Sequence, residues 1–134
     1  MLVRLYDVDV AFSPMIMSDS FSSSQKARDN EFTTWTERLP GKWEGQSPDR
    51  PLVVQFAANK VQDFVTSAQL VQGYCEGVDL NCGCPQRWAA QEGIGACLIN
   101  KPDFIHDLVR QTKNQTCSGL SISVKIRIHA DIKQ

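Results

Sequence analysis

Four strand-length apolar runs constrain the fold of this chain more than any other feature of its sequence. They cover residues 8–16 (VDVAFSPMI), 51–56 (PLVVQF), 77–81 (GVDLN) and 121–128 (SISVKIRI). Short apolar runs that are rich in β-branched residues are typical of buried strands. We therefore expect four strands, separated by segments long enough to hold helices.

Two of the intervening segments carry an apolar stripe with helical spacing. Lys60 to Tyr74 has apolar residues three and four positions apart, with Asn59 as the expected N-cap. A second stripe runs from Pro102 to Gln115, with the proline in the favoured first turn. Strand and helix in alternation predict an α/β fold, in which helices cover a parallel sheet.

Residues 36–50 (TERLPGKWEGQSPDR) interrupt this alternation. The segment contains prolines and glycines and has no periodicity, so we expect a surface loop or an insertion. At 134 residues the chain is long enough for one domain but not for two of ordinary size.

Charge and hydropathy limit the classes of partner. The formal net charge of −1 argues against nucleic-acid binding by a general positive field, although tRNA remains possible if a basic surface lies elsewhere. No apolar run is long enough to span a bilayer, and Asp7 and Asp9 interrupt any signal-peptide core. We expect an intracellular protein, cytoplasmic or nuclear, without a membrane partner.

Five cysteines lie at positions 75, 82, 84, 97 and 117. Their odd number argues against a disulfide framework, and free thiols are the favoured interpretation. A small zinc module built from the first four is a less favoured alternative, because structural zinc sites usually draw paired ligands from two tight turns.

Polar residues fall at the ends of three predicted strands. Gln55 lies near the end of one run, Asn81 and Cys84 follow the next, and Lys125 lies in the second half of the last, on the same face as Ser123. The carboxyl ends of parallel strands share one edge, where ligands bind in α/β folds. The pattern thus brings an amide, a thiol and an ammonium together. For Cys84 the alternative is a buried small hydrophobe.

The segment around Cys84 resembles the signature of a known family. Val78 to Ala96 (VDLNCGCPQRWAAQEGIGA) resembles the signature of the tRNA-dihydrouridine synthases, with an apolar–Asp–apolar lead, then Asn-x-Gly-Cys-Pro and a spaced Gly-Ala. The similarity extends over nearly the whole chain outside residues 36–50, and is strongest to the eukaryotic subgroup related to the fourth yeast enzyme. The matching segments are PMI at 14–16, QKARDNEFTT at 25–34, VVQFAAN at 53–59, ACLINKP at 96–102 and VKIRIH at 124–129.

The resemblance implies FMN-dependent reduction of uridine to 5,6-dihydrouridine in the D-loop of tRNA, with NADPH as the reductant. Cys84 matches the family's general acid, which protonates C5 of the uracil, whereas Cys82 occupies the variable position of the motif. Gln55 and Lys125 match residues that contact the flavin, and Asn81 matches a residue that holds the target uracil. The resemblance implies no metal site.

The resemblance also implies a partial TIM (β/α)₈ barrel, roughly strands 2–5 with their helices, as one domain over residues 1–134. Complete barrels need about 250 residues. We therefore expect a chain that is truncated at both ends, incomplete and by itself inactive, and that lacks most of the tRNA-binding regions. Open barrel edges favour self-association. The alternative is a non-catalytic isoform that acts as a binding or pairing module.

Overall fold

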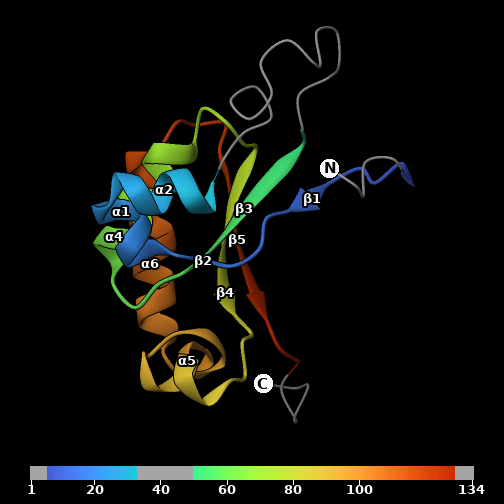
Figure 1. Ribbon diagram of the computed structural model, residues 1–134. Coiled ribbons are helices and arrows are strands. Elements are labelled where there is room, and N and C mark those ends of the chain that lie inside the picture. Colours follow the sequence, from blue (N-terminus) through green and yellow to red (C-terminus); the bar gives the residue numbers. More distant parts are fainter. Residues whose placement is uncertain (1–5, 33–49, 129–134) are drawn as a thin grey trace, which may run out of the picture.

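A computed structural model describes residues 6–32 and 50–128 as a parallel sheet with helices packed on one side (Figure 1). The strands are β1 (Ala11–Phe12), β2 (Ile16–Met17), β3 (Leu52–Ala57), β4 (Gly77–Cys82) and β5 (Ser121–Ile126). The helices are α1 (Ser18–Ser23), α2 (Gln25–Glu31), α4 (Val61–Val71), α5 (Arg87–Gln91), the 3-10 helix η2 (Gly95–Asn100) and α6 (Pro102–Gln115). The predicted α/β class with a parallel sheet is confirmed.

The sheet has the order β1–β3–β4–β5, with β2 also paired to β3. All the pairings are parallel, and the register places Gln55 opposite Asp79 and Asp79 opposite Ser123. Two residues further along each strand, Asn81 lies opposite Lys125. The carboxyl ends of β3, β4 and β5 therefore lie at one edge of the sheet.

The strand that we predicted over residues 8–16 is wrong in its extent. The structure has only β1 and β2 there, and residues 6–10 are exposed. Three residues, 13–15, separate β1 from β2, whereas only two residues, 54 and 55, separate their partners on β3. The chain therefore bulges at Ser13–Pro14–Met15. Pro14 has no N–H to donate to the ladder. The Ser13 hydroxyl accepts from the Gln55 backbone N–H at 2.9 Å and so restores one of the interrupted bonds.

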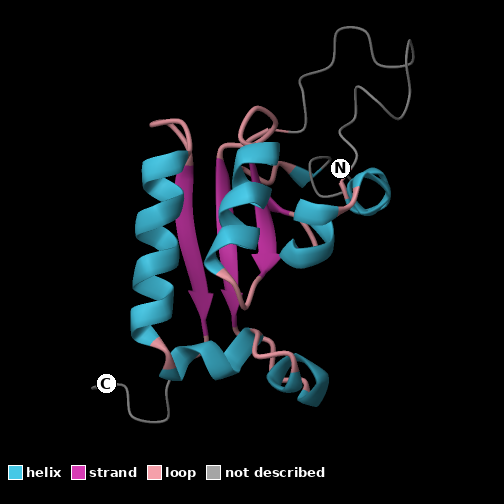
Figure 2. Cartoon of the chain, turned by 90° about the vertical axis from the view of Figure 1, so that its left-hand side faces the viewer, coloured by secondary structure: helices cyan, strands magenta, loops and turns pink. Residues whose placement is uncertain are grey.

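Helices α1, α4 and α6 cover one face of the sheet (Figure 2). This face carries Val54, Phe56, Val78 and Leu80, all of which are fully buried. Phe56 packs edge-to-face against Phe21 of α1 and against Phe64 of α4. These aromatic contacts add to the burial of apolar area that holds the layers together.

Helices α4 and α6 confirm the two predicted amphipathic segments, but the predicted N-cap of α4 is wrong. Lys60 occupies the cap position and makes no side-chain cap bond. Asn59 instead donates its side-chain N–H to the Glu92 carbonyl at 2.8 Å, and so links the end of β3 to the end of α5. Helix α6 spans the predicted residues and begins with Pro102 in its first turn.

The opposite face of the sheet carries the polar residues of the strands, because side chains alternate between faces. Among the described residues, no helix is long and apolar enough to span a membrane. The predicted loop or insertion at 36–50 lies outside the described residues except for Arg50, and it stays a prediction.

Candidate functional site at the carboxyl ends of the strands

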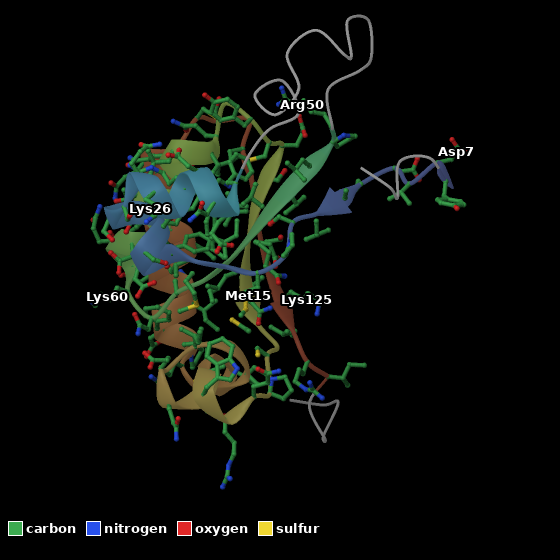
Figure 3. All side chains as sticks on the ribbon, viewed as in Figure 1. Asp7, Met15, Lys26, Arg50, Lys60 and Lys125 are labelled. Atoms are coloured by element: carbon green, nitrogen blue, oxygen red, sulfur yellow. The ribbon has the colours of Figure 1, made fainter. Side chains whose placement is uncertain are left out.

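The structure brings the four predicted site residues to one region of the molecule. Gln55, Asn81 and Lys125 come from β3, β4 and β5, on the face away from the helices, and Cys84 lies in the loop after β4. Figure 3 shows Lys125 on the side of the sheet opposite the helices. Helix α5 and η2 lie just beyond these strand ends (Figure 1).

A buried carboxylate connects the strands of this face. Asp79 is 2% exposed, and each of its oxygens accepts one hydrogen bond. Gln55 Nε2 donates to Oδ2 at 2.8 Å, and Ser123 Oγ donates to Oδ1 at 2.6 Å. Neighbouring strands are therefore joined through side chains as well as through the backbone ladder.

Asn81 extends this network to the loop that carries the thiol. Its Nδ2 donates to Gln55 Oε1 at 2.9 Å. Its Oδ1 accepts from the backbone N–H groups of Gly83 and Cys84, at 3.0 and 2.9 Å. An Asn side chain that accepts from the backbone two and three residues ahead closes a turn locally. The turn after β4 is thus fixed by a strand residue, and with it the backbone of Cys84.

Gly95 packs directly behind Cys84. The Cys84 carbonyl accepts from the Ala96 N–H at 2.9 Å, and Gly95 has a φ of +74°. A Cβ at Gly95 would lie 2.6 Å from the Cys84 carbonyl oxygen and 2.9 Å from the Cys84 Cβ. The small residues after the motif therefore allow close packing behind the thiol loop. The Cys84 side chain is half-buried, in an apolar cluster with Met15 and Met17.

Cys82 has a different environment from Cys84, although the two are only two residues apart. Its side chain is fully buried in the main core, on the helix side of the sheet. Burial, together with the nearby Asp79 and Cys97, raises the pKa of the Cys82 thiol to about 12. Burial likewise raises the pKa of Cys75 to about 11, and its thiol donates to the Val71 carbonyl. Both are unreactive core thiols.

Lys125 is exposed, and within residues 6–32 and 50–128 its ammonium has no hydrogen-bond or ion-pair partner. Its Nζ approaches Gly83, since a Cβ built there would lie 3.9 Å from it. A free ammonium therefore borders the thiol loop and the amide pair of Gln55 and Asn81. This set of groups can bind an anionic, hydrogen-bonding ring.

The described part of the chain contains no group of three or more His, Cys, Asp or Glu side chains placed to hold a metal ion. All five cysteines are free, and they range from buried to exposed. The alternative of a zinc module at Cys75, Cys82, Cys84 and Cys97 therefore has no geometric support among these residues.

Sequence reasoning missed three residues that shape this site. Asp79 was noted only as part of the motif, and its role depends on a cross-strand register that joins residues 24 and 44 positions apart. Ser13 was assigned to a continuous strand, and only the bulge shows that its hydroxyl is needed. Gly95 belongs to the spaced Gly-Ala of the motif, but no local pattern predicts its contact with Cys84.

Comparison with known proteins gives a consistent result. Residues 1–134 match the protein family described as dihydrouridine synthase (Dus). The chain is 49% identical over 134 residues to a Homo sapiens protein named tRNA-dihydrouridine(20a/20b) synthase-like, with NAD(P)+ also given in its name. This match covers 99% of the chain and 39% of the human protein.

Fungal proteins give the same result at lower identity. A Schizosaccharomyces pombe protein named tRNA-dihydrouridine(20a/20b) synthase is 37% identical over 133 residues, which are 99% of this chain and 37% of that protein. A Saccharomyces cerevisiae protein of the same name is 36% identical over 128 residues, 96% of this chain and 32% of that protein. The chain thus spans between about a third and two fifths of these relatives' length. Because the family matches every residue of the chain, the chain belongs to the dihydrouridine synthase family.

Proposed function

We propose that this chain contributes the proton-donating part, and half of the flavin-contacting part, of an enzyme that reduces uridine in tRNA to 5,6-dihydrouridine. The observation that carries the proposal is the convergence of Gln55, Asn81, Cys84 and Lys125 at the carboxyl ends of three adjacent parallel strands. The names of the relatives give the reaction, and the residues offer the groups that it requires.

Saturation of the 5,6 double bond of uracil needs a hydride and a proton. FMN, when bound, supplies the hydride to C6 of the ring, and NADPH is the reductant that recharges it. Cys84 donates the proton to C5 from the opposite side of the ring, and the thiolate that forms takes a proton from water. A thiol of ordinary pKa is protonated at neutral pH. Such a group can therefore serve as this acid. The buried Cys82 cannot reach a ligand.

The residues present fit one edge of a flavin ring. With Nε2 bonded to Asp79 and Oε1 to Asn81, the Gln55 amide retains one N–H and one lone pair. The flavin edge offers both a hydrogen-bond acceptor and a donor to such an amide. The free ammonium of Lys125 stabilises negative charge on the reduced ring. We assign Gln55 and Lys125 to cofactor binding on this basis.

Asn81 is assigned to the target uracil. Its oxygen already accepts two backbone hydrogen bonds and its Nδ2 already donates one, so a single N–H remains. That N–H can donate to a carbonyl oxygen of the uracil, but the side chain has no acceptor in place for the uracil N3–H.

Two further assignments belong to this proposal. The tRNA partner binds mainly through regions outside this chain, because a chain with a net charge of −1 offers no general positive field to hold RNA. The intracellular location stays a prediction. Self-association, as in a non-catalytic pairing module, is the second candidate function. It is favoured by the exposure of Phe12 on β1 and Ile126 on β5, which are 53% and 63% exposed at the outermost strands of the described sheet.

The function can be tested in a chimera, because the relatives are longer than this chain. Residues 1–134 would replace the matching segment of the human protein, and dihydrouridine in unmodified tRNA would be measured by mass spectrometry with FMN and NADPH present. We expect the chimera to form dihydrouridine. Cys84→Ala should lower its rate by about 100-fold or more, as loss of a general acid does.

The matched control is Cys82→Ala, which removes a core thiol that lies only two residues before Cys84. It should leave the rate per folded molecule unchanged. A chimera that binds FMN but keeps its full rate without the Cys84 thiol would contradict the assignment of the proton donor.

A further inference from the structure

The Asp79 carboxylate takes no part in the chemistry proposed above, yet it is buried among the residues that do. We propose that Asp79 is a positioning residue, which holds the Gln55 amide in one orientation and, through Asn81, helps to fix the turn that carries Cys84. The catalytic consequence of this inference rests on the proposed function, but the positioning itself does not.

The direction of the hydrogen bonds is set from both ends of the network. An ionised carboxylate accepts hydrogen bonds and donates none, so Gln55 must direct Nε2 toward Asp79. Its Oε1 then faces Asn81, which must present Nδ2. The Asn81 oxygen is left to accept from Gly83 and Cys84, whose backbone N–H groups can only donate. One arrangement satisfies every group.

Without the carboxylate, one end of this network is released. Asn81 would still hold the Gln55 oxygen, but Gln55 Nε2 would be buried with no acceptor. A buried polar group without a partner destabilises the fold, and the group moves or draws in water to recover a bond. The N–H and the lone pair that Gln55 keeps for a ligand would then lose their fixed directions, and the restraint on Asn81 would weaken.

Ser123 provides a way to separate the shape of Asp79 from its role as an acceptor. In Asp79→Asn, the new amide can direct its oxygen to Gln55 and its N–H to Ser123 Oγ, because a hydroxyl both donates and accepts. The direction of the network survives in that variant. In Asp79→Asn combined with Ser123→Ala, the Asn amide has no partner on that side and can turn either end toward Gln55.

The experiment compares Asp79→Leu, Asp79→Asn, Ser123→Ala and the double variant with the unchanged 134-residue chain. Hydrogen exchange of the Gln55 side-chain amide is followed by NMR, and the alkylation rate of Cys84 by iodoacetamide is followed by peptide mass spectrometry. We expect exchange at Gln55 to rise at least about tenfold in Asp79→Leu and in the double variant. The Cys84 rate should change severalfold in the same two. Asp79→Asn and Ser123→Ala alone should stay within about twofold.

Asp79→Asn should keep slow exchange at the Gln55 amide, and the double variant should lose it. A purely packing role of Asp79 would not produce this pair of results. The polar double variant also keeps the test decisive if Asp79→Leu does not fold. Additive effects of the two single substitutions, or an unchanged Gln55 signal in folded Asp79→Leu, would overturn the inference.

A fluorescence titration with FMN separates this inference from the proposed function. If the chimera with the human protein binds no FMN, the proposed function fails, while the exchange and alkylation rates still decide the role of Asp79. If FMN binds, we expect its affinity to fall about tenfold in Asp79→Leu and in the double variant, and to change less than about twofold in Asp79→Asn or Ser123→Ala alone. Equal affinity in all the variants would contradict the positioning of Gln55.

Discussion

At the scale of single residues, the position of Cys84 depends on a glycine that lies eleven residues later in the chain. Gly95 adopts a φ of +74°, which a residue with a side chain adopts at a cost of about 1–3 kcal/mol. A Cβ added at Gly95 would also lie 2.6 Å from the Cys84 carbonyl oxygen. Conformation and contact both require glycine there.

We therefore expect Gly95→Ala to destabilise the fold by roughly 2–4 kcal/mol, from backbone strain and overpacking together. The turn at Cys84 must also shift, so the alkylation rate of its thiol should change. Urea denaturation and iodoacetamide kinetics measure the two effects. Gly73→Ala is the matched control, because nothing lies within 4 Å of its Cβ position and its φ is not positive. Equal stability of the two variants would contradict this account.

At the scale of elements, Glu76 joins three strands at the edge of the sheet opposite the site. Its backbone N–H donates to the Leu52 carbonyl, and its own carbonyl accepts from the Ser121 N–H, both at 2.9 Å. Its carboxylate accepts from the Leu52 N–H at 2.7 Å and also pairs with the half-exposed Arg50. The register of β3, β4 and β5 is therefore fixed at this residue.

Glu76→Ala should lower the free energy of unfolding by about 1–3 kcal/mol, because the partly buried Leu52 N–H loses its side-chain acceptor. Glu76→Gln keeps an acceptor and should have a smaller effect. Arg50→Ala should cost less than about 1 kcal/mol, since exposed ion pairs contribute little. Thermal and urea unfolding of the three variants test this order. A larger effect of Arg50→Ala than of Glu76→Ala would contradict it.

The elements differ in how well the sequence predicts them. Helix α6 has the bounds of its predicted stripe because Pro102 marks its start and apolar periodicity its length. The strands β3, β4 and β5 match their runs within two residues, because burial on the helix side keeps the pattern apolar. The predicted strand over residues 8–16 is interrupted at Pro14, where a bulge replaces the hydrogen-bond ladder. The short helices α1 and α2 are rich in polar residues and carry no apolar stripe to predict them.

The site shows the same division between local and non-local information. Placing Gln55, Asn81 and Lys125 at one edge follows from the parallel order of the strands, which the sequence supports. The contacts of Asp79 with Gln55 and Ser123 depend on the register between strands, which no local pattern encodes. The roles assigned to Cys84, Gln55, Asn81 and Lys125 stay proposals.

At the scale of the whole molecule, the described sheet has helices on one face (Figure 2). Its polar site residues lie on the other face. In the described part of the chain, β5 pairs only with β4, and Ile126 projects an exposed apolar side chain from its end. An open strand edge with exposed apolar residues is a template for pairing with another chain.

We expect the 134-residue chain to associate reversibly at concentrations on the order of 100 µM, as unpaired edges do. Ile126→Lys should weaken the association by about tenfold, because a charge on an edge strand opposes pairing. Leu70→Lys is the matched control, since Leu70 is exposed on α4, away from the edge. Sedimentation velocity over a concentration series measures both. A monomer at every concentration, or equal effects of the two variants, would contradict the prediction.

The turn held by Asn81 has a consequence for the kind of chemistry that this thiol can perform. In cysteine hydrolases and acyltransferases, backbone N–H groups beside the nucleophile form an oxyanion hole that stabilises a tetrahedral adduct. Here the N–H groups of Gly83 and Cys84 both point at the Asn81 oxygen, so neither is available to a substrate. The turn therefore disfavours acyl transfer at Cys84, and leaves its sulfur suited to giving up a proton without attacking a carbonyl.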